Sequence, residues 1–259
     1  MIITILSVII TGIAVSFIST LFGLGGGILM VPVLSLILPY SHVESIATSL
    51  ATIVLVTSFN TYNFNRKGVI VWSIVPWIAL TSAIFAFVSA RLSTILSEQV
   101  LIIVFLVFLV WVALRTFLIK DIKRSKPPAK LAKILPLGIG ALSGSISGLT
   151  GIGGGGVTTP LTLISGLVKN IQAAPTSNAI MIFTALFASL SFALIENPVD
   201  SPFTIGYIHL DTAAFLFIGS LLFSRLGVRI NQNVSLIWRK TVLGTILLFI
   251  CVRLFLMLI

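Results

Sequence analysis

"FGLGGGILMVP", residues 22–32, decides how this chain is built, and "TGIGGGGVTTP", residues 150–160, repeats it. Adjacent glycines disfavour a helix, because glycine loses more conformational freedom on folding than any other residue. Both stretches nevertheless lie inside long apolar segments. The sequence therefore predicts two apolar helices, each interrupted at the same position of a repeated pattern.

The composition is that of an integral membrane protein. Of the 259 residues, 58% are hydrophobic and only 8% are charged, whereas soluble domains carry about 25% charged residues. Uncharged stretches recur along the chain, and about 20 apolar residues are enough for a helix to cross the hydrocarbon core. The strict alternation that a β-barrel requires is missing. We therefore expect an all-α polytopic membrane protein.

The net charge of +10 does not indicate nucleic acid binding. Lys and Arg cluster in short loops between apolar segments, which is the positive-inside pattern of membrane proteins. Cys251 is the single cysteine, so no disulfide framework is expected. We see no metal-ligand cluster, buried carboxylate pair or nucleophile motif, and so expect no catalytic residues, no metal site and no cofactor. Residues 1–21 are expected to be a retained first helix rather than a signal peptide.

The chain is a tandem repeat of two halves. A constant offset in the numbering, the first offset, superimposes the glycines and proline of the first stretch on those of the second, Gly23 on Gly151 and Pro32 on Pro160. The same offset superimposes Thr48-Ser49 on Thr176-Ser177. Further along the chain, a larger offset, the second offset, pairs Gly68 with Gly206. The second half therefore carries an insertion near residues 195–204. The predicted domains are a first transmembrane repeat at 1–119, a basic cytoplasmic linker at 120–133 and a second repeat at 134–259.

Loop charge predicts the orientation of each half. The linker holds six basic residues against one acid, so we place it in the cytoplasm. Residues 61–67 precede two predicted spans, about 69–90 and 99–119, and so lie on the same side. Their counterpart, 196–211, has three acids and no Lys or Arg, which indicates the external side. The halves are therefore expected to be inverted repeats; the alternative is two parallel four-helix halves.

Inversion requires an odd number of crossings between residues 134 and 195. Three elements fit: about 134–150, a short element ending near 168, and about 174–195. The short element reaches only about 18 Å, so it is either a half-helix or one arm of a re-entrant hairpin. Pro32 and Pro160 either open the two short helices or kink them.

The glycine breaks are the predicted binding site. Inverted repeats with broken, short apolar helices at corresponding positions indicate a transporter site near the membrane midplane. Freed backbone N–H groups and the positive end of the following half-helix favour an anion. The alternative is that the glycines only permit close helix packing. A dinucleotide site at Gly151, Gly153 and Gly156 is excluded, because the next acid, Glu196, is far beyond the required spacing.

Two polar motifs follow the glycine runs. "ATSLA", residues 47–51, and "PTSNA", residues 175–179, are expected to begin the next span of each half. Their hydroxyls can donate to an oxyanion without burying a full charge. The alternative is that these hydroxyls bond to their own helix backbone. Coupling to protons would ordinarily need an intramembrane acid, and Glu44 is the only acid near these motifs.

"GLGGGILMVP" and "GIGGGGVTTP", followed by "ATSLA" and "PTSNA", resemble the TauE/SafE sulfite exporter family, also called the toluenesulfonate uptake permeases. The resemblance covers essentially the whole chain. It implies a multi-pass protein of the bacterial inner membrane, a secondary transporter of small sulfur-containing anions such as sulfite, sulfonates or thiosulfate. The direction of transport, the coupling ion (proton or sodium) and the oligomeric state stay open.

The resemblance places the substrate site on the glycine runs and the polar motifs after them. The residues are Gly25, Gly26, Gly27, Thr48, Ser49, Gly153, Gly154, Gly155, Gly156, Thr176, Ser177 and Asn178. Ile28 stands where the second half has Gly156, and Leu50 where it has Asn178, so we expect an asymmetric site with more polar groups from the second half. Other functions left open are a passive anion channel, a transporter of another small organic anion, and a scaffold or assembly factor.

Overall fold

The computed structural model describes residues 12–13, 27–38, 40–118, 128–196, 203–233 and 236–256, without the side chains of 37, 115–118, 129–130, 132–133 and 222–243. Most of the predicted first helix, Gly25, Gly26 and residues 120–127 of the predicted linker lie outside this description. Helices form nearly all of the described chain. The all-α class is therefore confirmed.

The helices come in two similar series. The first comprises α2 (Gly27–Ile37), α3 (His42–Asn65), α4 (Val75–Ser93) and α5 (Glu98–Leu118). The second comprises α6 (Ala129–Thr150), α7 (Gly155–Ile164), α8 (Asn170–Ala193), α9 (Leu210–Asn233) and α10 (Leu236–Leu256). Between α8 and α9 lies an antiparallel hairpin of β1 (Thr204–Ile205) and β2 (Ile208–His209).

The helix bounds follow the two offsets found in the sequence. Under the first offset, α2 and α7 begin at corresponding positions, and α3 and α8 correspond at both their first and their last residues. Under the second, larger offset, α5 and α10 correspond at both ends. The described hairpin directly follows the predicted insertion near residues 195–204, and the corresponding residues 66–71 form no strand.

The apolar helices are long enough for a membrane protein. Among the described residues, α3, α4 and α8 have the length and apolar composition to cross a bilayer, and shorter apolar segments occur in α2, α5, α6, α9 and α10. At 1.5 Å per residue, α2 and α7 extend only about 15–17 Å, half of the hydrocarbon thickness.

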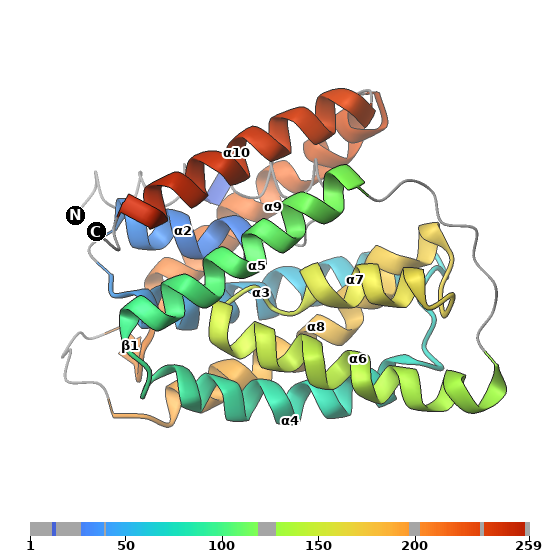
Figure 1. Ribbon diagram of the computed structural model, residues 1–259, viewed down its shortest axis with the longest axis horizontal. Helices are drawn as coiled ribbons and strands as arrows, with labels where there is room; N and C mark the ends of the chain where they lie inside the picture. Colours follow the sequence, from blue (N-terminus) through green and yellow to red (C-terminus); the bar gives the residue numbers. More distant parts are fainter. Residues whose placement is uncertain are drawn as a thin grey trace.

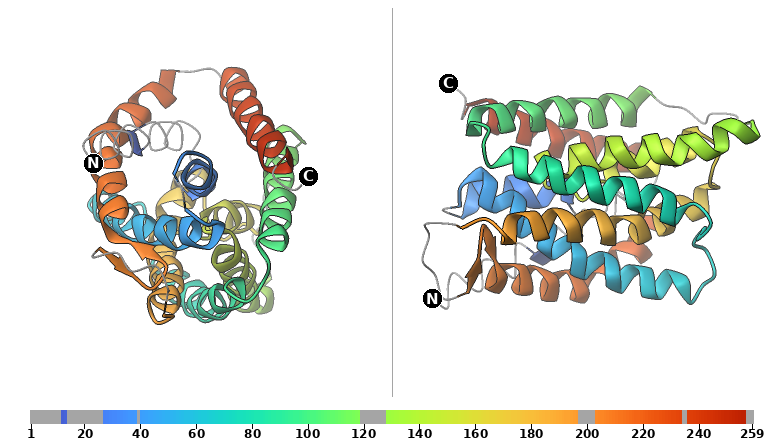
Figure 2. Two further views of the ribbon diagram at one scale, coloured as in Figure 1. Left: turned by 90° about the vertical axis from the view of Figure 1, so that its left-hand side faces the viewer. Right: turned by 90° about the horizontal axis from the view of Figure 1, so that it is seen from below.

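Helices α6 and α7 form a hairpin, because α7 returns toward the end of the bundle at which α6 begins (Figure 1). The short element is thus half as long as a span and is also paired with its predecessor in a hairpin. Helices α3 and α8 run in opposite directions through the bundle (Figures 1 and 2). Residues 66–74 therefore lie at one end, the linker end, and the β1–β2 hairpin lies at the other, the hairpin end.

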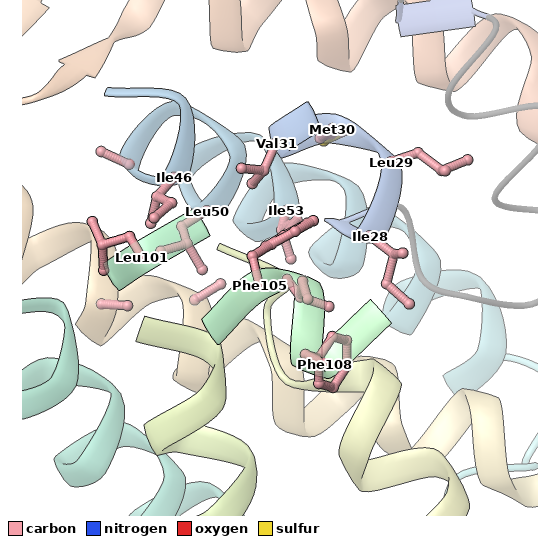
Figure 3. Packing of buried hydrophobic residues seen from close by; sticks show 14 of the residues in the cluster. Ile28, Leu29, Met30, Val31, Ile46, Leu50, Ile53, Leu101, Phe105 and Phe108 are labelled. Carbon is pink, nitrogen blue, oxygen red and sulfur yellow. The ribbon is translucent and has the colours of Figure 1, made fainter. Parts of the chain in front are cut away.

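The short helix α2 lies inside the bundle, with longer helices around it in the end-on view of Figure 2. Its first residues are fully or almost fully buried: Ile28, Leu29, Met30 and Val31. Figure 3 shows these side chains in one apolar cluster with residues of α3 and α5, among them Leu50 and Phe105. The centre of the protein is therefore built around a broken helix rather than around a full span.

Helices α3 and α8 begin earlier than the sequence predicts. The predicted start of the later span was about residue 174, but α8 begins at Asn170, and α3 begins at His42. Ser41 caps α3: its backbone N–H donates to Glu44 Oε2 at 2.8 Å, and its hydroxyl accepts from the Glu44 N–H at 3.3 Å. Gln172 Oε1 accepts from the Lys169 N–H at 3.1 Å at the start of α8. The capping box of α3 and the Gln172 contact at the start of α8 place "ATSLA" and "PTSNA" in the second turn, not the first.

The two prolines do not open the short helices. Pro32 and Pro160 are each the sixth residue of their helix. The prediction that these prolines open the short helices is therefore wrong. A proline at this depth removes one intrahelical hydrogen bond. Both short helices are therefore weakened in the middle as well as limited in length.

A row of glycines fixes the contact between α6 and α4. Gly140, Gly144 and Gly148 recur every four residues and so lie on one face of α6. A Cβ atom at Gly144 would collide with the Ser82 carbonyl of α4, whereas a Cβ atom at Gly138 would meet nothing within 4 Å. Small residues at such spacing let membrane helices approach closely.

We predict that Gly144→Ala lowers the thermal stability of the protein and that Gly138→Ala does not. Both changes gain about 1 kcal/mol of helix propensity, but only the first forces α4 and α6 apart, at a cost of about 1–3 kcal/mol. The melting temperature in detergent measures the difference. Equal effects of the two variants would contradict the packing described here.

Candidate functional site

The break between α6 and α7 needs glycine for its backbone conformation. Gly151 caps α6 with φ of +72°, and Gly153 and Gly154 follow with φ of +75° and +82°. This left-handed region is open to glycine and costly for most other residues. Gly154 is the N-cap of α7, so Gly155 and Gly156 lie in the first turn, where N–H groups have no intrahelical acceptor.

The second glycine run lies between α3 and α8, the two helices that carry the polar motifs. The Ser49 hydroxyl of α3 donates to the Gly151 carbonyl at 2.9 Å, in a fully buried contact. On the other side, a Cβ atom at Gly155 would collide with the Met181 sulfur of α8. Ser177 lies one turn before Met181 on α8, so the two share a face. The structure thus brings together the second glycine run and motifs from both halves.

The tips of the two short helices meet. A Cβ atom at Gly27 would collide with the backbone of Ile152, and one at Gly153 would press on Ile53 and Met181. Close packing against backbone therefore accounts for Gly27, which was the alternative to a binding role, whereas Gly153 and Gly155 meet side-chain atoms. Gly154 differs, because the nearest atoms to its Cβ position, in Ser143 and Thr184, are 3.4 Å away. Gly25 and Gly26 lie outside the described residues.

The difference between Ile28 and Gly156 has a packing reason. These residues correspond in the repeat under the first offset. The Ile28 Cδ1 atom lies 3.3 Å from the place of a Cβ atom on Gly156, and Phe108 lies 3.0 Å from the same place. Because the corresponding positions face each other, there is room for one side chain and not for two.

The hydroxyls of the polar motifs do not bond to their own helix. Thr48 Oγ1 accepts from the His209 N–H at 3.2 Å, and Thr176 Oγ1 accepts from the Val71 N–H at 3.1 Å. Ser177 is 2% exposed, and its hydroxyl has no partner among the described residues. Other buried hydroxyls do bond to their own helix four residues back; they belong to Thr52, Thr57, Thr158, Thr162 and Thr184.

The two threonine contacts are reciprocal. Thr48 corresponds to Thr176 under the first offset, and their donors His209 and Val71 correspond under the second, so both members of each pair have a counterpart in the repeat. Each threonine is bound by the loop that belongs to the other half. The His209 contact involves the hairpin, and the Val71 contact involves the linker end (Figure 1). Among the described residues, neither threonine hydroxyl donates a hydrogen bond.

Asn178 provides a further link between the motif helices. Its Oδ1 accepts from Asn60 Nδ2 of α3 at 3.4 Å, and its Nδ2 donates to the Ala174 carbonyl at 2.8 Å. The corresponding residue, Leu50, lies in the apolar core and is fully buried. Asn178 therefore joins α8 to α3.

Sequence reasoning missed the polar pair beside Gly154. The Ser82 hydroxyl of α4 and the Thr184 hydroxyl of α8 are 2.7 Å apart and buried. Thr184 Cγ2 also lies 3.4 Å from the place of a Cβ atom on Gly154, at ordinary van der Waals distance. The four-residue recurrence of Gly140, Gly144 and Gly148 was the available signal, because it predicts a close neighbour for α6, although not which helix.

Comparisons with known proteins find similarity over almost the whole chain. The model of the sulfite exporter TauE/SafE family matches residues 8–254. A probable membrane transporter protein of Haemophilus influenzae is 28% identical over 266 residues, which cover 97% of this chain and 98% of the relative. A probable membrane transporter protein of Methanocaldococcus jannaschii is 27% identical over 246 residues, covering 92% and 91%. No solved structure gives a significant match.

We predict that Ser49→Ala destabilises the protein by about 1–3 kcal/mol, because it leaves the buried Gly151 carbonyl without its donor. The control is Thr52→Val on the same helix, whose hydroxyl bonds only to the Thr48 carbonyl of its own helix. Thermal unfolding in detergent should separate the two, with a drop of about 2–4 °C for each kcal/mol. A larger effect of Thr52→Val would contradict the role given to Ser49.

Proposed function

The chain belongs to the sulfite exporter TauE/SafE family, and on that premise we propose that it is a secondary transporter that moves a small sulfur-containing anion by alternating access. Membrane transport and the lack of enzymatic activity follow from the family and its relatives, which are named as probable membrane transporters. The anion, of the sulfite, sulfonate or thiosulfate type, and the alternating mechanism are the proposal.

The observation that carries the proposal is the meeting of a broken helix with both polar motifs. The second glycine run lies between α3 and α8, bound to Ser49 and packed on Met181. Irregular backbone at membrane depth is tolerated only where protein or a water-filled cavity surrounds it. In transporters such breaks serve as substrate sites, with half-helix N-termini directed at anionic groups.

The substrate site that we propose comprises the two glycine runs and the polar motifs. The donors are the first N–H groups of α7 at Gly155 and Gly156 and the hydroxyls of Thr48, Thr176 and Ser177. Sulfite, sulfonates and thiosulfate present several oxygens that accept hydrogen bonds, and N–H groups at a helix N-terminus suit them. Binding by neutral donors would hold the anion without trapping it in a permanent ion pair. The remaining members of the site are Gly25, Gly26, Gly27, Ser49, Gly153, Gly154 and Asn178.

We further propose that the two series of helices are inverted repeats, residues 1–119 and 134–259, joined by the cytoplasmic linker. The opposite directions of α3 and α8 (Figure 1) and the reciprocal threonine contacts support this arrangement. Alternating access then consists of opening one of these two contacts while the other stays closed. The hairpin end would be external and the membrane would be the bacterial inner membrane.

Counterflow in proteoliposomes tests the proposed function. Labelled sulfite, sulfonates and thiosulfate are offered outside vesicles loaded with the same unlabelled anion. We expect saturable, transient accumulation of label for one of them. Conductance without saturation or counterflow would indicate a passive anion channel, and neither transport nor any ligand-dependent shift in thermal stability would indicate a scaffold protein; either outcome overturns the proposal.

We predict that Ser177→Ala reduces counterflow at least tenfold, by removing a hydroxyl that stabilises the bound anion by roughly 1.5–3 kcal/mol. It should not lower the melting temperature, since the hydroxyl has no protein partner among the described residues. The matched control is Ser191→Ala, a buried serine that also has no partner among the described residues, about 21 Å further along α8. Full counterflow by Ser177→Ala, or equal loss in both variants, would remove Ser177 from the site.

A further inference from the structure

A buried acid–imidazole pair joins the two halves at the hairpin end. His209 Nε2 of β2 lies 3.3 Å from Glu44 Oε1 of α3, and their side chains are 9% and 10% exposed. The other carboxylate oxygen, Glu44 Oε2, accepts from the Ser41 N–H and hydroxyl, both at 2.8 Å. The start of α3 therefore fixes the carboxylate, and its free oxygen is directed at the hairpin.

His209 makes contacts that hold the hairpin against the start of α3. Its ring stacks on Tyr40, with centroids 4.0 Å apart and planes 9° apart. Tyr40 is itself held by a 2.7 Å hydrogen bond to Thr212 at the start of α9. The His209 backbone N–H binds Thr48 of the polar motif. Movement of the hairpin away from α3 must therefore break the contact to Glu44 and the contact to Thr48 together.

The surroundings of the His209 ring suit both of its protonation states. Nδ1 lies 3.3 Å from Thr204 Oγ1, and a hydroxyl can donate to a neutral ring or accept from a charged one. Nε2–H donates to Glu44 in either state. A charged imidazolium binds a carboxylate more strongly than a neutral imidazole does. Histidine ordinarily changes charge between about pH 5 and 8.

The other half has no titratable counterpart of this pair. The residue that corresponds to Glu44 is Gln172, and the residue that corresponds to His209 is Val71. Both loops share the backbone contact to a threonine, but only the hairpin end adds an acid and a histidine. The two ends therefore differ in charge as well as in the presence of the β1–β2 hairpin.

Other titratable or charged groups are present at this end. They are His42, Arg91, Glu98, Glu196, Tyr207, Asp211 and Arg253, besides Tyr40. Among the described residues, none of them has a hydrogen bond to the Glu44 carboxylate or to the His209 ring; Glu98 instead accepts from the His42 N–H at 3.1 Å, and Asp211 from the Thr212 N–H at 2.7 Å. Among the hydrogen bonds of the described residues, Glu44 and His209 thus have no titratable partner other than each other.

We propose that Glu44 and His209 form a proton-binding site and that proton uptake by this pair closes the hairpin end over the polar motif. The inference rests on the proposed function, because closure matters only if the two ends open alternately. A proton on His209 strengthens the contact to Glu44 only in the closed state, so it shifts the population toward closure. The linker end, with Gln172 and Val71, does not respond.

Amide hydrogen exchange measured by mass spectrometry tests this site in the full-length protein without substrate. With intrinsic exchange rates matched, we expect residues 203–211 to exchange about fivefold more slowly at pH 6 than at pH 8. Glu44→Gln should abolish this difference. Glu98→Gln, the same chemical change at the neighbouring acid, should retain it. Residues 66–74 should show no difference in any of the three proteins.

No pH dependence in the wild-type hairpin, or the same dependence in Glu44→Gln, overturns the proposal. If Glu44→Gln does not fold, His209→Gln replaces it with the same two readings, since it keeps the backbone contact to Thr48. The measurement needs no transport, so its failure is distinguishable from failure of counterflow, which would overturn the proposed function instead.

Discussion

The structure depends on one constraint: a helix that stops in apolar surroundings must find partners for its backbone groups. The Gly151 N–H donates to the Ser147 carbonyl at 2.8 Å, closing the end of α6. The Gly151 carbonyl accepts from Ser49, which belongs to the other half. At the start of α7, the Gly154 carbonyl accepts from the Thr158 N–H and hydroxyl. The break is thus completed by both halves, and the first N–H groups of α7 have no acceptor within their own helix.

The sequence predicted which helices correspond, because glycine and proline keep their spacing in both copies and α3 and α8 match at both ends. It did not predict where these helices begin. The capping residues, Ser41 with Glu44 and Lys169 with Gln172, precede the apolar run and resemble a loop in composition. Nor could it predict the partners of the motifs, since Ser49 and Gly151 are far apart in the chain and no local pattern joins them.

The departures from the repeat have two different physical meanings. Ile28 and Gly156 correspond in the repeat and also face each other, so their difference follows from packing near the centre, and not from a more polar second half. Glu44 and His209 differ from Gln172 and Val71 in charge and lie at one end of the bundle. The first departure lets the two short helices meet; the second distinguishes the two ends between which an anion would move.

The sidedness of the two loops tests the central claim, that the halves are inverted, most directly. In a Cys251→Ser background, single cysteines replace Lys67 at the linker end and Phe203 at the hairpin end, both of which are exposed. A membrane-impermeant thiol reagent is applied to intact cells and then to opened membranes. The inverted arrangement predicts that intact cells label Phe203→Cys alone and that opened membranes label both. Labelling of both positions, or of neither, in intact cells would place the two loops on the same side and contradict it.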